Sequence, residues 1–517
     1  MICSVIAFAA LTGPLPKLGV VVVAGLAALT LLARDRRGRA LAMLGALVLS
    51  PVLLLSAIWS SPQLGVVHRH PLYALVGGVL ALAVLGVAAS RLARRPAVLG
   101  PLAVLALPFR VPIQAGGVTS NLLVPLYLVV AAGSLAWLVP VLVESSRFPQ
   151  RPRLIEGSQG WGLWVERLLA LYVVLYAVQA IYSPDFEKAL QQMVFFYVPF
   201  ALLYQLLRGL HWTPLLVRRC LQLLVVLAVI FSVIGFAEYA TKTIILNPKL
   251  VVANDLHAYF TVNSVFFDPD IFGRFLALVM VLLAVLLIYD RRQREQVTVM
   301  VSLAVLWAGL VLTLSRSSLG ALLLGLGVLA ALRWKPTRAL IVAVAVIVLG
   351  GAAVALSPAT FGLNQGLNGV SSGRGGLVSG GLSLFADRPV WGYGSGSFVS
   401  EYRIHHRATA TTLSASHTIP VTVAAEQGLI GEVVYVALVV VALVCLVRRA
   451  RGDPVRAALA AAFAALVFHT MLYADFLEDP TTWALLGIGV ALAGESGRDR
   501  VRAAPAAATS RGPVPAS

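Results

Sequence analysis

Two hydrophobic runs decide the fold of this chain: ALIVAVAVIVLGGAAVAL (residues 339–356) and IPVTVAAEQGLIGEVVYVALVVVALVCLV (residues 419–447). A polar segment, residues 357–418, separates them. A helix crosses about 30 Å of hydrocarbon with about 20 apolar residues, so each run is long enough to span a membrane. We therefore expect the chain to cross a membrane, form a polar loop on the far side and cross back.

The whole chain has the composition of a membrane protein. Of its 517 residues, 59% are hydrophobic and 12% are charged, which is more apolar material than one soluble core buries. The net charge of +18 does not indicate a nucleic-acid-binding protein, because Lys and Arg are scattered in short runs between apolar stretches. The three cysteines have neither metal-ligand spacing nor the even count of a disulfide framework.

Eight basic clusters predict the topology. They lie at residues 34–39, 91–95, 147–153, 208–219, 291–294, 333–338, 448–456 and from 498 onward. Two apolar runs separate each neighbouring pair, so all clusters fall on one side of the membrane, and the excess of Lys and Arg assigns that side to the cytoplasm. The expected fold class is all-α: a polytopic transmembrane helical bundle of about 14–16 spans with one large outward loop.

We divide the chain into four predicted parts. Residues 1–265 are N-terminal transmembrane spans, and residues 266–447 are a core that contains the large outward loop, residues 357–418. Residues 448–496 form a C-terminal transmembrane hairpin. Residues 497–517, rich in Ala, Pro and Arg, are expected to be a disordered cytoplasmic tail.

The three candidate residues Arg316, Arg374 and His417 all fall on the outward side. Arg316 lies between two serines, Ser315 and Ser317, in a short turn between apolar runs. A guanidinium offers a planar fork of donors that fits phosphate oxygens, while the serines either add hydroxyl donors or cap the following helix. His417 precedes the second run, where an imidazole is suited to act as a general base or as a helix cap. An interfacial, lipid-anchoring arginine is the alternative reading of Arg316.

The outward loop contains further candidates. Asp387-Arg388-Pro389, followed by Trp391-Gly392-Tyr393-Gly394, predicts tight turns in which glycine permits close backbone approach. Trp391 and Tyr393 suit either stacking on a sugar or the lipid interface. Composition does not choose between these two roles.

Charges also occur beside the span that begins at Ile271. Arg274 lies one turn inside it and needs a partner, for which Asp270 is the nearest candidate in sequence. Asp268-Pro269-Asp270 has the D-x-D form of some metal-dependent glycosyltransferases, but acids before a span also suit a helix N-terminus. We favour the helix N-terminus and expect no metal site.

The spacing of these residues resembles the O-antigen ligase and polymerase superfamily of bacterial envelope enzymes. That family has an S-R-[GS] turn, an outward loop with Arg and P-x-x-G-x-G, and a His that opens a helix containing Glu and G-x-x-G. The matching residues are Ser315-Arg316-Ser317, Arg374, Pro389 to Gly394, His417, Glu426 and Gly428-Leu429-Ile430-Gly431. The resemblance covers residues 266–447 and departs at Thr418, where the family usually has Asn, Ser or Gln.

The resemblance implies a metal-independent glycosyltransferase, without cofactor, in the cytoplasmic (inner) membrane. It would move a glycan from undecaprenyl diphosphate to an acceptor hydroxyl on the outer side. The implied catalytic residues are His417, Arg316 and Arg374, and the candidate binding residues are Ser315, Ser317, Arg274, Arg388, Tyr393 and Glu426. The expected partners are a lipid-linked glycan donor, a glycan or glycolipid acceptor and membrane lipids, with no nucleic acid.

Other functions stay open at this point. Ligases and polymerases share these motifs and differ in the acceptor. A flippase of lipid-linked glycans is a second possibility, although a transporter usually has ionisable residues near the middle of several spans. A non-catalytic polysaccharide assembly protein is a third.

The first prediction concerns metal dependence. The sequence has no His, Asp or Glu cluster with ligand spacing apart from Asp268 and Asp270. We expect glycan transfer to survive EDTA, and Asp270→Asn to lower the yield of folded protein more than the turnover of the folded fraction. The measurement is transfer rate with and without chelator. Restoration of a chelator-inactivated enzyme by Mg²⁺ or Mn²⁺ would contradict this prediction.

Overall fold

The computed structural model describes most of the chain as helices. It describes residues 14–58, 69–115, 118–147, 160–245, 254, 260–289, 293–334, 337, 374–406 and 416–508. The expected span at residues 339–356 lies outside these residues. Within them the predicted all-α class is confirmed, because 11 helices are long and apolar enough to cross a membrane. Pro96–Ala106, Gln296–Leu312 and Pro480–Gly494 are shorter apolar helices.

The N-terminal half of the bundle ends with α10. Its helices are α1 (Leu15–Leu32), α2 (Arg36–Ile58), α4 (Pro71–Arg94), α5 (Leu99–Ala106), α6 (Val124–Arg147), α7 (Trp161–Ala180), α8 (Phe186–Gln192), α9 (Val198–Gly209) and α10 (Pro214–Thr241). A 3₁₀ turn, Pro96–Val98, precedes α5, and a π-helical turn, Met193–Tyr197, joins α8 to α9. The loop after α5 contains a two-stranded antiparallel hairpin, β1 (Val111–Ala115) and β2 (Val118–Leu122), that sequence analysis did not predict.

The C-terminal half holds the predicted outward loop. Its helices are α12 (Pro269–Tyr289), α13 (Gln293–Leu312), α14 (Arg316–Arg333), α17 (Arg374–Asp387), α18 (Phe398–His406), α19 (Ile419–Val447), α20 (Pro454–Leu472) and α21 (Pro480–Ala508). The described part of that loop therefore contains two helices, α17 and α18. The last helix extends to Ala508, into the segment 497–517 that we predicted as a disordered tail, and the rest of that segment lies outside the described residues.

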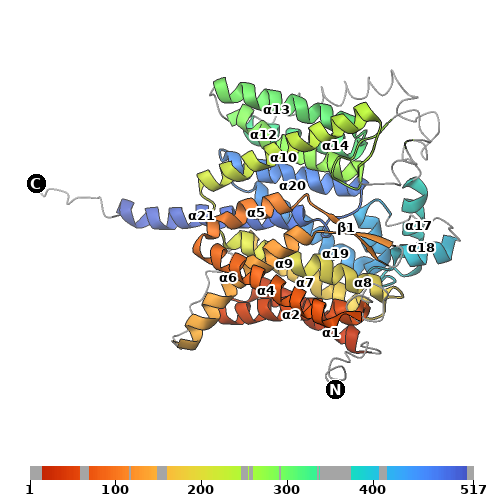
Figure 1. Ribbon diagram of the computed structural model, residues 1–517. Coiled ribbons are helices and arrows are strands. Elements are labelled where there is room, and N and C mark those ends of the chain that lie inside the picture. The colour runs from red at the N-terminus through yellow and green to blue at the C-terminus, as the bar shows by residue number, and fades with distance from the viewer. Residues whose placement is uncertain are drawn as a thin grey trace, which may run out of the picture.

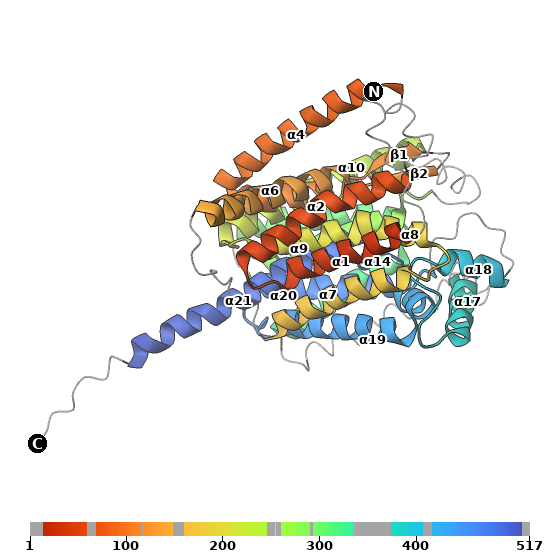
Figure 2. The same cartoon turned by 90° about the horizontal axis from the view of Figure 1, so that it is seen from below.

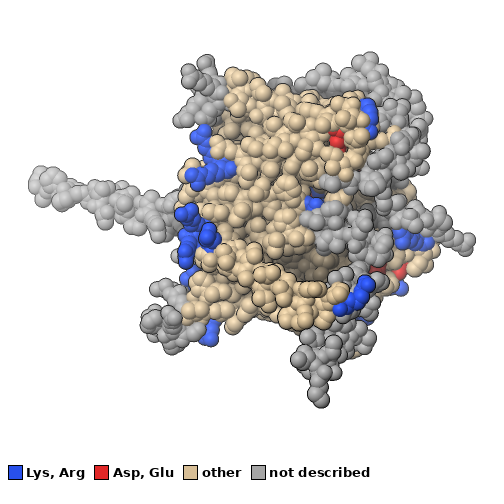
Figure 3. Space-filling view, in the orientation of Figure 1, with Lys and Arg blue, Asp and Glu red and all other residues tan. Residues whose placement is uncertain are grey.

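The two ends of the bundle differ in character. The loop end holds β1, β2, α17 and α18, and the C-terminal segment leaves from the other end (Figures 1 and 2). Figure 3 shows Lys and Arg gathered along that other end, which we call the basic end. This arrangement agrees with the even number of apolar runs between basic clusters.

One apolar core joins both halves of the chain. It extends from Val20 in α1 to Val490 in α21, and α7 packs against α19 while α9 packs against α21. A second, small core of Leu384, Tyr393, Phe398 and Ala425 lies between α17, α18 and α19. The division of the chain into four parts remains a prediction. Buried contacts between helices cross the boundaries of these parts.

The topology yields the second prediction. In a background lacking the three native cysteines, Ile404→Cys on α18, whose native side chain is 68% exposed, should react with a membrane-impermeant thiol reagent added outside spheroplasts. Its matched control is Arg451→Cys, an exposed position at the basic end, which should react only after permeabilisation. The reverse pattern would contradict the assignment of the basic end to the cytoplasm.

Candidate functional site

A break in α19 organises the loop end of the protein. Gly428 has φ +65° and interrupts the helix, which leaves backbone groups on both sides of the break without helical partners. The loop from Pro389 to Gly394 supplies those partners. Four backbone hydrogen bonds join the loop to the helix: Tyr393 N to Ala425 O (3.1 Å), Gly394 N to Glu426 O (2.7 Å), Leu429 N to Pro389 O (2.7 Å) and Ile430 N to Val390 O (3.4 Å). The P-x-x-G-x-G run is thus docked onto the kinked helix, and we call it the docked loop.

Two glycines permit this close contact. A Cβ on Gly392 would lie 2.3 Å from the carbonyl oxygen of Glu426, and a Cβ on Gly428 would lie 2.4 Å from the carbonyl oxygen of Val390. Both glycines also have positive φ, +66° and +65°, which other L-residues adopt at a cost. The first glycine of the P-x-x-G-x-G run and the first glycine of the G-x-x-G motif therefore lie at the same backbone interface.

Glu426 fastens the docked loop from inside α19. Its buried carboxylate accepts hydrogen bonds from the backbone N–H of Gly396 (2.8 Å) and of Phe398 (3.0 Å), the first residue of α18. A carboxylate at a helix N-terminus is favourable because it satisfies free N–H groups. Both carboxylate oxygens therefore act within the protein, which favours a positioning role; the predicted contact with substrate stays a prediction.

Helix α7 holds the other side of the docked loop. The Tyr182 hydroxyl, just after the helix, donates to the Trp391 carbonyl (2.6 Å), and the Ser395 hydroxyl donates to the Tyr176 carbonyl (2.9 Å). The buried Gln179 side chain donates to the carbonyl of Gln427 (3.0 Å). The loop is therefore fixed by an N-terminal helix that sequence analysis did not connect to the site.

Two candidate binding residues, Arg388 and Tyr393, lie together on the docked loop. The exposed Arg388 guanidinium is 4.4 Å from the centre of the Tyr393 ring, a cation–π distance. The Tyr393 hydroxyl lies 3.2 Å from Nε2 of His405 on α18. Since Tyr393 is buried in the small core, its ring supports Arg388 and is not an open stacking surface.

The serine-arginine turn begins α14. Ser315 caps this helix by accepting a hydrogen bond from the backbone N–H of Ser318 (3.3 Å). The hydroxyls of Ser315 and Ser317 both donate to Oδ1 of Asp270, the latter at 3.1 Å. Arg316 is the first residue of α14 and its side chain is exposed. The serines thus fix the turn that carries the arginine, at the positive end of the helix dipole.

His469 on α20 belongs to the same cluster and was missed by sequence analysis. It is fully buried, and its Nε2 lies 3.2 Å from the Ser317 hydroxyl and 3.1 Å from the Ser318 hydroxyl. The available signal was its position in the apolar run AAFAALVFHTML, because an ionisable residue inside a span needs a polar partner.

Tyr473 connects this turn to His417. Its ring centre is 5.6 Å from that of His469, 5.9 Å from that of His417 and 6.0 Å from the guanidinium carbon of Arg274. Burial, reinforced by the nearby Asp268 carboxylate, raises the pKa of the Tyr473 hydroxyl well above its usual value. Tyr473 therefore stays neutral. Its ring lies between His417, Arg274 and His469, and His469 contacts the serine-arginine turn.

His417 lies at the mouth of α19, one residue before the N-cap Thr418. Its φ of +58° is in the left-handed region, a conformation that costs about 1–3 kcal/mol in a non-glycine residue. Strain of this kind persists where the surrounding structure holds a side chain in one direction. The break at Gly428 lies about 15 Å further along α19, so His417 and the docked loop are attached to the same short helical segment.

Arg274 has a different partner from the one we predicted. Its guanidinium forms an ion pair with Asp479 at 2.5 Å, and both side chains are buried. We expected Asp270 on the basis of i,i+4 spacing, but Asp270 instead accepts from the serine turn. The α20–α21 turn supplies the correct counter-ion, which no local spacing reveals.

Asp268 and Asp270, at the start of α12, have partners within the protein. Burial, together with the neighbouring Asp270, raises the pKa of Asp268 to about 6. Asp268 also accepts the backbone N–H of Asp270 at 2.7 Å, the pattern of an Asx turn at a helix start. Among the residues described, no group of three or more His, Cys, Asp or Glu is arranged to hold a metal ion.

The predicted residues thus form two groups. Around Tyr473 lie Arg274, the turn Ser315–Ser317 and His417. On the docked loop lie Arg388, Tyr393 and Glu426. Arg374 is the first residue of α17, but its side chain is outside the described part of the structure.

Comparison with known protein families matches residues 301–436 to the family described as O-antigen ligase. The match includes the serine-arginine turn, the docked loop, His417 and the break in α19, and it confirms the resemblance noted from sequence. Comparison with curated proteins finds no match.

The third prediction tests the docked loop. Gly428→Ala adds a Cβ at a positive φ and against the Val390 carbonyl, so we expect a loss of at least about 1–2 kcal/mol in stability. The expected result is a lower thermal unfolding midpoint in detergent. Gly376→Ala on α17, where a Cβ meets nothing within 4 Å, is the matched control and should leave the midpoint unchanged or raise it slightly, because alanine is favoured over glycine inside a helix. Equal midpoints for the two variants would rule out a tight backbone interface.

Proposed function

We propose that the protein is a glycosyltransferase that acts on glycans at a membrane, because residues 301–436 match the O-antigen ligase family and lie within a multi-pass helical bundle. The donor in this proposal is a glycan on undecaprenyl diphosphate. The acceptor is a hydroxyl of a second glycan or glycolipid. The reaction takes place on the outer side of the cytoplasmic membrane, at the loop end.

One observation carries the proposal: the turn that holds Arg316 is linked to His417 through two buried side chains. Ser317 contacts His469, His469 packs on Tyr473, and Tyr473 packs on His417. A cation at a helix N-terminus and a histidine are thereby held at one end of the bundle. Transfer from a diphosphate requires a cation to bind the leaving group and a base to accept the proton of the acceptor hydroxyl.

Arg316 suits the diphosphate. Backbone N–H groups and the dipole at the start of α14 favour an anion there, and the exposed guanidinium adds charge-assisted donors. Negative charge develops on the diphosphate as its bond to the sugar breaks, so donors fixed in advance lower the barrier. Arg374, at the start of α17, is proposed to supply the second guanidinium.

His417 suits the acceptor. In the proposed step, the acceptor oxygen bonds to the anomeric carbon while the bond from that carbon to the diphosphate oxygen breaks. His417 takes the hydroxyl proton, and undecaprenyl diphosphate leaves with the electron pair. The step needs no metal in this proposal, because the arginines neutralise the leaving group.

A flippase is the second candidate function, and buried ionisable groups are the observation that favours it. The ion pair of Arg274 with Asp479 and the buried Glu426 are ionisable groups near the membrane, as a transporter would have. However, Arg274 and Glu426 each lie within about two turns of a helix start and have partners inside the protein. This placement favours the enzyme over the transporter.

The fourth prediction separates the arginine from the histidine. Arg316→Lys keeps the charge but loses the planar fork, so we expect transfer to fall by about tenfold or more together with donor affinity. Arg333→Lys, at the basic end of the same helix, is the matched control and should behave as wild type. His417→Ala should abolish turnover while donor affinity is retained, because a base acts on the acceptor.

The measurements are release of undecaprenyl diphosphate and binding of lipid-linked glycan, with purified protein in nanodiscs. If His417→Ala loses donor affinity as strongly as Arg316→Lys, the histidine belongs to the diphosphate site and another group is the base. If His417→Ala retains full turnover, the proposed enzyme mechanism is wrong.

A further inference from the structure

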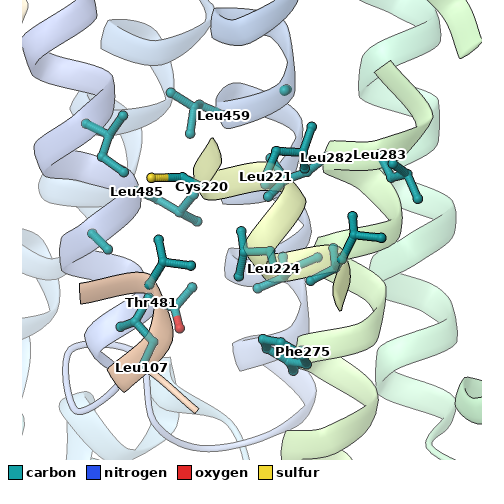
Figure 4. A pocket seen from close by; sticks show the side chains of 18 of the residues that line it. Leu107, Cys220, Leu221, Leu224, Phe275, Leu282, Leu283, Leu459, Thr481 and Leu485 are labelled. Atoms are coloured by element: carbon teal, nitrogen blue, oxygen red, sulfur yellow. The ribbon is translucent and has the colours of Figure 1, made fainter. Parts of the chain in front are cut away.

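His469 follows a long apolar stretch of α20. Residues 457–468 contain only alanine, leucine, valine and phenylalanine. The early part of this stretch lines an apolar cavity of about 980 Å³, and Leu459 is one of the side chains that Figure 4 shows there. On α20 the cavity ends at Ala462, about two turns before His469. A buried imidazole in such a helix is costly unless polar groups surround it, so the groups that it contacts indicate its role.

One ring nitrogen of His469 faces the serine-arginine turn. Its Nε2 lies 3.2 Å from the hydroxyl of Ser317 and 3.1 Å from the hydroxyl of Ser318. All three side chains are buried. In a site that excludes water a hydrogen bond is strong and its loss is costly, so these contacts constrain the turn.

The direction of these hydrogen bonds follows from Asp270. Its carboxylate and its backbone carbonyl can only accept. The Ser317 hydroxyl donates to the carboxylate (3.1 Å), and the Ser318 hydroxyl donates to the carbonyl (3.3 Å). A hydroxyl has one proton, so both serine oxygens are left to accept from His469. Its Nε2 therefore carries a hydrogen and donates to the turn.

The turn that His469 contacts has a strained backbone. Leu314, just before the cap residue Ser315, has φ +53°, in the left-handed region that residues with a Cβ adopt at a cost. Strain of this kind persists where the surrounding structure holds it. Hydrogen bonds from the serines to Asp270 and from His469 to the serines supply that constraint. Loss of one of them lets the turn relax, and Arg316 moves with it.

Three helices fit closely around this cluster. A Cβ on Gly320 of α14 would lie 2.8 Å from the ring of Phe468, the residue before His469. A Cβ on Gly273 of α12 would lie 2.7 Å from the hydroxyl of Ser318. Because the packing leaves so little space here, a change at position 469 alters the turn directly.

We propose that His469 is a positioning residue for Arg316. Its Nε2–H holds the serine-arginine turn in the form that presents the guanidinium to an anionic group of the substrate. The identity of that group, a diphosphate, rests on the proposed function. The affinity of the protein for a diphosphate thus depends on a hydrogen-bond donor that lies on another helix and does not touch the substrate.

Two amide variants separate the hydrogen bond from mere polarity. The side-chain nitrogen of His469→Gln is as many bonds from Cα as Nε2 and reaches the serines, whereas that of His469→Asn is one bond short. We expect His469→Asn to weaken binding of undecaprenyl diphosphate by about tenfold, and His469→Gln to stay within about threefold of wild type. The measurement uses folded full-length protein in nanodiscs. Equal losses in the two variants would overturn the proposal.

A neighbouring buried hydroxyl provides the matched control. Thr470, also fully buried on α20, donates to the Val467 carbonyl of its own helix at 2.7 Å. Thr470→Val removes this polar group and should bind undecaprenyl diphosphate as wild type does. A loss as large as that of His469→Asn would show that any polar change in α20 acts through the fold, which contradicts the proposal.

A double variant tests whether the effect passes through Arg316. If it does, His469→Asn adds little to the loss in Arg316→Lys, and the double variant binds undecaprenyl diphosphate within about twofold of Arg316→Lys alone. Losses that multiply, to about a hundredfold, would show independent action and overturn the proposal.

A reporter in the turn tests the positioning without a ligand. In a background lacking the native cysteines, Leu314→Cys replaces a side chain that is 46% exposed and is labelled with a membrane-impermeant thiol reagent. We expect His469→Asn to change its labelling rate by at least about threefold and to leave that of Ile404→Cys on α18, the matched control, unchanged. An unchanged rate at position 314 would overturn the proposal. A changed rate in protein that binds no diphosphate would refute the proposed function alone.

Discussion

The structure of the loop end depends on backbone hydrogen bonding at the break in α19. In a lipid environment a helix that breaks must find partners for its freed N–H and C=O groups inside the protein. Here the docked loop supplies them, and Glu426 and α7 fix that loop in turn. The same interface fixes the start of α18 and the helical segment that begins just after His417. A single backbone requirement therefore determines the position of several side chains that the sequence separates widely.

Electrostatics at the loop end are local and mostly balanced. Arg274 is paired with Asp479, and Asp270 receives the hydroxyls of the serine turn. Burial, with a smaller contribution from the neighbouring Asp270, raises the pKa of Asp268. In the proposed function, anion binding falls to Arg316, whose side chain is exposed. The net charge of the chain says little about this arrangement, since most of its Lys and Arg lie in the clusters that set topology.

Sequence analysis reached the fold class because hydropathy and loop charge act locally along the chain. The serine-arginine turn, the docked loop and His417 were also found, since each has a compact motif. The partners of these residues were not found: Asp479 for Arg274, His469 for Ser317, and Gln179 for Gln427 are joined by long-range packing that no spacing encodes. Glu426 was found by spacing but given a role at the substrate, because a sequence does not show that two backbone N–H groups face its carboxylate. The β1–β2 hairpin was missed because its short strands have no clear alternation.

The contact between α7 and α19 has a consequence for biogenesis. The side chain of Gln179 is fully buried and donates to the carbonyl of Gln427, 248 residues later in the chain. When the ribosome has inserted α7, that carbonyl has not yet been synthesised, and a polar amide in lipid without a partner is costly. The N-terminal spans therefore enter the membrane with a polar patch that only the late arrival of α19 satisfies. This contact therefore forms only after α19 has been synthesised, and truncated chains that end before α19 should be preferred targets of membrane quality control.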